Sequence, residues 1–139
     1  MTPILITSIT CLIDMIIKWF LPYNCNWTII NKPMFTLSIV KQYNKGFAFG
    51  LRNSDEAWVN NMINVLALII MSIYIGYSEW NVYLISLMIA GSSNFLDRLL
   101  TGGTVTDWIS VRFGKYRFPI FNIADAMINL NFVAYYILT

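Results

Sequence analysis

The 139-residue chain is 58% hydrophobic and only 12% charged, whereas about a quarter of the residues in a soluble domain carry charge. The net charge of +2 is too small to favour nucleic acid, and the nine basic residues form no continuous run. The sequence has no histidine, which removes the usual base of serine and cysteine nucleophiles and the commonest metal ligand.

Residues 4–21 are the first of four apolar stretches, each near the roughly 20 residues that cross a bilayer core of about 30 Å. This stretch lacks a basic beginning and a small-residue cleavage site, so we expect a retained helix and not a removed signal peptide. Within it, Asp14 and Lys18 stand four residues apart and can form a structural ion pair. The other stretches are residues 59–77, 82–100 and 120–138. They predict a single domain over residues 1–139, mainly α and integral to a membrane, with four transmembrane helices.

Two polar segments, residues 22–58 and 101–119, separate these stretches. In the first, residues 35–39 alternate between apolar and polar, which is the period of a half-buried strand. Residues 105–113 alternate in the same way in the second segment. The second and third stretches are joined only by residues 78–81, which predicts an antiparallel helical hairpin. Four spans place both polar segments on one side of the membrane, so the sequence predicts a small β-rich cap over one end of the helices.

Asp107 and Asp125 are carboxylates in apolar surroundings. Asp107 falls on the same side of its predicted strand as the apolar residues, and Asp125 lies five residues into the predicted fourth helix. That position is about 7.5 Å of rise below the start of the helix. Ionisable groups at such depth usually face a bundle interior or a water-filled cavity. Both aspartates belong to the capped end, where they can serve as an acid–base pair or as a proton or ion relay.

Further polar residues gather near these aspartates. Asn94, Asp97 and Arg98 share one side of the third helix near its capped end, and Asn122 precedes Asp125 by three residues on the fourth. The first, third and fourth helices therefore contribute to one polar interior. Whatever chemistry occurs there must rest on carboxylates, amides, hydroxyls or lysine.

Five short motifs resemble, in order, those of the lipoprotein signal peptidase family, or signal peptidase II. Asp14 to Lys18 resembles D-x-x-x-K, residues 44–50 N-x-G-x-A-F, Asn94 to Arg98 N-x-x-D-R, Val105 to Trp108 V-x-D-F, and Phe121 to Asp125 F-N-x-A-D. Together they cover positions 14 to 125 on a four-span plan, and five in order are highly specific. Trp108 stands where the family usually has Phe, and residues 90–94 are less rich in glycine.

The resemblance implies an aspartic endopeptidase that removes signal peptides from diacylglyceryl-modified bacterial prolipoproteins, cutting on the amino side of the lipidated cysteine. It implies that Asp107 and Asp125 are the catalytic pair. It implies supporting roles for Asp14, Asn44, Gly46, Asn94, Arg98 and Asn122. The expected partners are these precursors and membrane lipids, without nucleic acid, metal or organic cofactor, and we expect a monomer. From the residues alone, one alternative is a small proton- or ion-translocating membrane protein that uses the same buried carboxylates. A second is a non-catalytic assembly or lipid-binding membrane protein in which Asp107 and Asp125 only pair with Arg98 and Lys18.

The direction of insertion is where charge and resemblance disagree. Counting positive charges would place the cap in the cytoplasm, because most of them lie in the two polar segments. The resemblance implies a multi-pass protein of the bacterial inner or plasma membrane whose active site is toward the non-cytoplasmic face. We follow the resemblance, because long segments often override the charge rule. The basic residues concerned are Lys32, Lys41, Lys45, Arg52, Arg112, Lys115 and Arg117.

Overall fold

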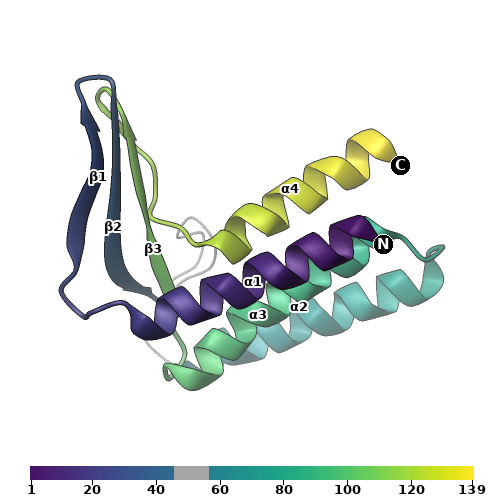
Figure 1. Ribbon diagram of the computed structural model, residues 1–139. Helices are drawn as coiled ribbons and strands as arrows, with labels where there is room; N and C mark the ends of the chain where they lie inside the picture. Colours follow the sequence, from purple (N-terminus) through teal and green to yellow (C-terminus); the bar gives the residue numbers. More distant parts are fainter. Residues whose placement is uncertain (46–56) are drawn as a thin grey trace.

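The computed structural model describes residues 1–45 and 57–139 (Figure 1). In these ranges the chain forms four helices, with an antiparallel four-stranded sheet at one end of them. The helices are α1 (Thr2–Phe20), α2 (Ala57–Tyr77), α3 (Val82–Leu100) and α4 (Ile123–Leu138). The strands are β1 (Asn26–Lys32), β2 (Phe35–Asn44), β3 (Val105–Phe113) and β4 (Tyr116–Arg117). The predicted combination of helices with a small β-rich unit is confirmed.

The helices are polar inside and apolar outside. Helix α3 contacts each of the other three, and the side chains buried among the helices are largely polar or charged. On α1, by contrast, Leu5, Leu12 and Trp19 are 60%, 62% and 73% exposed. This arrangement suits a lipid environment, in which apolar side chains face the lipid and ionisable groups face the interior of the helix bundle. The buried polar side chains on the described helices are Thr7, Asp14, Lys18, Ser86, Asn94, Asp97, Arg98 and Asn131.

The described helices differ in how well they could cross a bilayer. By length and composition, α1 alone among them is long and apolar enough. The 61–77 part of α2 and all of α4 are apolar but shorter. Helix α4 starts three residues later than predicted because Phe121 pairs with Ile109 of β3 and Asn122 caps the helix. The presence of four spans therefore stays a prediction.

The predicted hairpin of α2 and α3 is confirmed, with α2 ending at Tyr77 and α3 beginning at Val82. Asn81 is the N-cap of α3. Its side-chain oxygen accepts hydrogen bonds from the backbone N–H groups of Tyr83 at 2.9 Å and Leu84 at 3.4 Å. These two donors have no partner inside the helix, so the asparagine stabilises the turn that reverses the chain.

The sheet joins the two polar segments of the sequence. β2 pairs with β3 from Phe35 opposite Phe113 to Asn44 opposite Val105, so chain segments far apart in sequence lie side by side (Figure 1). β1 was not predicted from the sequence because a register shift between Thr28 and Ile30 breaks its apolar–polar alternation. This pairing carries the beginning of β3 to the ends of α1 and α3.

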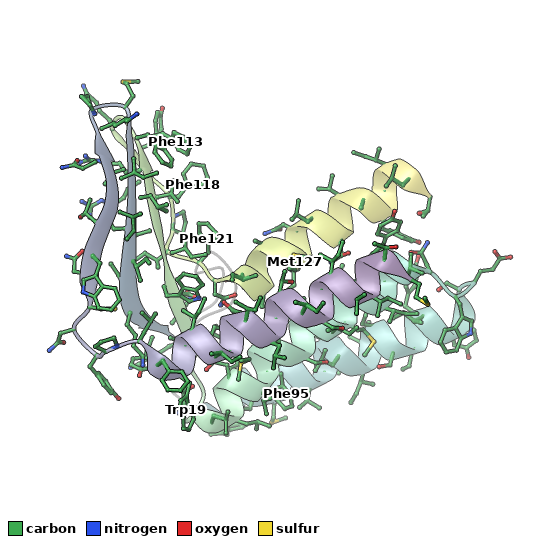
Figure 2. All side chains as sticks on the ribbon, in the orientation of Figure 1. Trp19, Phe95, Phe113, Phe118, Phe121 and Met127 are labelled. Atoms are coloured by element: carbon green, nitrogen blue, oxygen red, sulfur yellow. The ribbon has the colours of Figure 1, made fainter. Side chains whose placement is uncertain are left out.

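Small side chains form the apolar centre between α1, α3 and α4. Cys11, Ala90 and Ala124 are buried together, and Met127 and Ile128 pack against them. Met127 lies on the side of α4 that faces α1 (Figure 2). Because both alanines are fully buried, the helix backbones can approach closely there. This close packing fixes the start of α4 relative to α1 and α3.

Candidate active site

Asp107 lies near the beginning of β3, where both sides of the strand are buried. Residues 105–108 are all buried, so the alternation that separates the two sides in sequence does not separate inside from outside here. The side chain of Asp107 is on the side that meets Asn44 of β2 and Asn122. The Nδ2 of Asn44 donates to its Oδ2 at 3.2 Å, and the Nδ2 of Asn122 donates to its Oδ1 at 3.0 Å. Both carboxylate oxygens thus accept hydrogen bonds from neutral amides.

Asp125 occupies the third position of α4, and the predicted depth of five residues is corrected accordingly. It forms a capping box with Asn122: Asn122 Oδ1 accepts from the Asp125 N–H at 2.8 Å, and Asp125 Oδ2 accepts from the Asn122 N–H at 3.4 Å. A carboxylate in the first turn also faces the positive end of the helix dipole. On its other oxygen, Asp125 accepts a hydrogen bond from Asn94 Nδ2 at 2.8 Å.

Asn122 connects the two aspartates. It is fully buried, and its Nδ2 lies 3.0 Å from Asp107 Oδ1, 3.2 Å from Asn94 Oδ1 and 3.4 Å from the Thr106 carbonyl oxygen. Its Oδ1 is held by the backbone of Asp125. One asparagine therefore ties the strand that carries the first carboxylate to the helix that carries the second.

The electrostatics of Asp107 follow from this burial. Its side chain is 3% exposed, and loss of hydration together with the nearby charge of Asp125 raises its pKa from 3.8 to about 7. Hydrogen bonds from Asn44 and Asn122 and the charge of Lys18 oppose this rise. A carboxyl group with such a pKa exchanges a proton near neutral pH, as an acid or base catalyst needs to do.

We expect the stability of the protein to reflect this pKa. Because the folded pKa of Asp107 lies above 3.8, its contribution to stability is complete below about pH 4 and is lost as the pH rises through about 7. Asp107→Asn cannot acquire the charge, so it should unfold at a higher temperature than wild type at pH 8. The difference should shrink at pH 5. Thermal unfolding in detergent at both pH values measures it, and an equal difference at the two would contradict this account.

Asp14 and Lys18, both on α1, pair as predicted, with Lys18 Nζ 2.9 Å from Asp14 Oδ2. Asp14 is fully buried, and its Oδ1 accepts from Trp108 Nε1 at 2.8 Å and from the Ile123 N–H at 2.9 Å. The pair is therefore more than a link within α1. It holds the start of β3 and the start of α4 against that helix.

Asp97 and Arg98 organise the connection from α3 to β3. Asp97 Oδ2 accepts from the Thr106 N–H at 2.7 Å and lies 3.3 Å from Lys18 Nζ. Arg98 Nη1 donates to the Gly103 carbonyl at 3.0 Å, and the Gly103 N–H donates to the Arg98 carbonyl at 2.7 Å. Gly103 has φ 104°, a region that other residues rarely adopt. Asn94, Asp97 and Arg98 are all buried, so their predicted common side is confirmed.

Of the predicted site residues, the structure brings Asn44, Asn94, Asn122 and the two aspartates into one hydrogen-bonded group. Asp14 and Arg98 support it from the helices, and Gly46 lies outside the described residues. Sequence reasoning did not assign site roles to Lys18, Thr106 and Trp108. An indole N–H on a strand that enters the helices needs a partner, and this was the available signal for Trp108. Within residues 1–45 and 57–139, no three His, Cys, Asp or Glu side chains gather in a way that could hold a metal ion.

Comparisons with known proteins agree on one family. The family model for "Signal peptidase (SPase) II" matches residues 6–139. A lipoprotein signal peptidase of Staphylococcus aureus strain bovine RF122 / ET3-1 is 29% identical over 95% of this chain and 83% of its own length. One from Staphylococcus haemolyticus is 32% identical over 68% of this chain and 61% of its own length.

Solved structures resemble the chain in fold. Two are described as bacterial membrane enzymes and cover 99% of this chain. The first has a TM-score of 0.77 and 28% identity over 86% of its chain, and the second has 0.73 and 30% over 91%. With the match of the family model over nearly the whole chain, these likenesses show that the protein is a membrane peptidase and belongs to the signal peptidase II family.

Proposed function

We propose that the protein is an aspartic endopeptidase in which Asp107 and Asp125 share one proton. The observation that carries this proposal is the buried Asn122 amide, which hydrogen-bonds Asp107 and caps the helix at Asp125. Two carboxyl groups this closely connected do not readily ionise together. The charged one takes a proton from water, while the protonated one polarises the scissile carbonyl and later protonates the leaving amine.

The proposed substrates are prolipoproteins whose cysteine carries a diacylglyceryl group, cut on the amino side of that cysteine. The relatives that the chain resembles are lipoprotein signal peptidases, which implies this substrate class. The lipid would hold the substrate at the membrane surface, and a groove of the four-helix unit would receive the signal helix. Membrane lipids are thus both the solvent of the enzyme and part of what it recognises.

Asn44, Gly46 and Arg98 are proposed to hold the substrate backbone next to the aspartates. Asn44 already donates to Asp107 from the end of β2, so a peptide held by Asn44 would lie next to the carboxyl pair. Asn94 and Asn122 keep the two carboxyl groups in place. Fixing the peptide bond relative to the catalytic groups is a large part of the rate that such sites supply.

Cleavage is tested most directly with the purified protein and a diacylglyceryl-modified precursor peptide, followed by mass analysis of the products. We expect two fragments, of which one begins at the lipidated cysteine. The same precursor without the lipid is the matched control and should be cut far more slowly. An intact lipidated precursor, together with acid-dependent proton flux in vesicles that contain the protein, would favour the proton-translocating alternative.

The proposed topology is a monomer with four spans in the bacterial inner or plasma membrane, with the sheet and Asp107 toward the non-cytoplasmic side. Lys45 and Lys115 are exposed beside the sheet, and Glu79 is exposed in the loop at the other end of the helices. We expect single cysteines at the two lysines to be labelled from outside the cell, and one at Glu79 only after the membrane is opened. The reverse pattern would support the positive-charge rule and contradict the proposed orientation.

The labelling experiment needs a background without native thiols. Cys11 and Cys25 are both free, and both are buried. Their replacement by alanine ensures that only the introduced cysteine can be labelled. Cleavage by this background variant should match that of wild type before any labelling is interpreted.

A further inference from the structure

Lys18 is a buried ammonium group with three oxygen atoms close to it. Lys18 is 4% exposed. Its Nζ lies 2.9 Å from Asp14 Oδ2, 3.3 Å from Asp97 Oδ2 and 3.3 Å from Asn94 Oδ1. An ammonium group can only donate, and Lys18 donates a hydrogen bond to the amide oxygen of Asn94 while it forms ion pairs with the two carboxylates. Two of the acceptors are carboxylates that balance its charge. The third is a neutral amide, and this contact leads toward the active site.

The contact with Lys18 determines which way the Asn94 amide is turned. Its oxygen meets Lys18 Nζ and Asn122 Nδ2, which is 3.2 Å away. Lys18 can only donate, and the orientation of Asn122 is fixed independently by the Asp125 N–H on its oxygen. Turning the Asn94 amide over would place its NH₂ group against two donors and its oxygen 2.8 Å from a carboxylate oxygen of Asp125. Both contacts would be repulsive.

We infer that Lys18 is a positioning residue of the active site: held by Asp14 and Asp97, it fixes the Asn94 amide with its NH₂ group toward Asp125. The inference rests on the proposed function, because it assigns a role within the same catalytic pair. Within residues 1–45 and 57–139, no hydrogen bond or ion pair joins Lys18 to Asp107 or Asp125. It acts through Asn94, and its loss lets that amide turn and move Asp125 away from its working position.

Kinetics of three variants test whether Lys18 acts through Asn94. Lys18→Met and Asn94→Ala should each lower kcat by up to about 100-fold, since small displacements in a catalytic site have effects of this size. The double variant should lose no more than the more impaired single variant, because the two changes break one connection. Losses that multiply in the double variant would overturn the inference.

A second measurement does not depend on cleavage. In protein labelled with ¹⁵N-asparagine, the side-chain NH₂ signal of Asn94 is identified by its absence from Asn94→Ala. Hydrogen bonding to a carboxylate separates this signal from those of exposed amides, and in Lys18→Met it should move toward theirs. An unmoved signal would overturn the inference. If the wild-type protein cleaves no lipidated precursor, the proposed function fails, while this signal still decides the role of Lys18.

Two further variants separate positioning from folding. Lys18→Met alone leaves the buried carboxylates of Asp14 and Asp97 without their cation. The same measurements are therefore repeated with Lys18→Met combined with Asp97→Asn, which leaves only Asp14 in that state. Lys41→Met is the matched control. Lys41 Nζ donates to the Leu21 carbonyl at 2.9 Å. The Lys41→Met variant should leave kcat and the Asn94 signal unchanged. A change as large as that in Lys18→Met would overturn the positioning role of Lys18.

Discussion

Asp107→Asn and Asp125→Asn, each alone, are expected to abolish cleavage of a lipidated precursor while the protein still inserts and folds. Asparagine has nearly the size of aspartate and keeps much of its hydrogen bonding, but it can neither take a proton from water nor share one with its partner. Asn122 and Asn94 can still contact the substituted side chains, which preserves the local structure. Initial rates of the purified variants measure the effect, with thermal unfolding in detergent as the folding control.

The double variant sharpens this prediction. If the two carboxyl groups form one acid–base unit, loss of both should reduce the rate no further than loss of one. A well-folded single variant that keeps more than about a tenth of wild-type turnover would have lost under roughly 1.4 kcal/mol of transition-state stabilisation. Such a result would exclude the mechanism proposed for Asp107 and Asp125.

Asp14→Asn should mainly destabilise the protein, by about 3 kcal/mol, because it removes one partner of a buried ion pair. Its oxygen could still accept from Trp108 and Ile123, but its NH₂ group would then face the Lys18 ammonium. The fraction that remains folded should keep turnover within about tenfold of wild type, because Asp97 still holds Lys18. Thermal unfolding and cleavage rates, measured on the same preparation, separate the two effects.

The matched control for this variant is Asp14→Asn combined with Lys18→Met. Lys18→Met removes the ammonium group that the introduced NH₂ group would face, which should recover part of the lost stability, although it also takes the cation from Asp97. Unfolding of Asp14→Asn at the wild-type temperature would show that the pair does not stabilise the fold. A complete loss of cleavage by the folded protein would instead place Asp14 in the catalytic machinery.

Features with a short sequence spacing were predictable from the sequence. The Asp14–Lys18 pair and the buried side of α3 with Asn94 depend on the turn of a helix, which brings residues three and four apart together. The hairpin of α2 and α3 follows from a connection too short for any other path. The order of the short motifs likewise led to the family that the comparisons show.

Contacts between distant segments were harder to predict from the sequence. The start of α4 was misplaced because Phe121 pairs with β3, and strand pairing across the chain does not show in local periodicity. β1 was missed because its bulge removes the alternation on which strand prediction depends. In both cases the deciding hydrogen bonds join residues that are far apart in sequence or out of register.

By itself, the sequence indicated that this chain places polar residues inside and apolar residues outside, and that two aspartates belong to one end of its helices. These properties follow from composition and from regular spacing. Only the tertiary structure decided that Asn122 joins Asp107 to the start of α4 and that Lys18 reaches Asp125 through Asn94. Hydrogen bonds are short and directional, so the partner of a buried amide is settled only when strands and helices are packed to within a few tenths of an ångström.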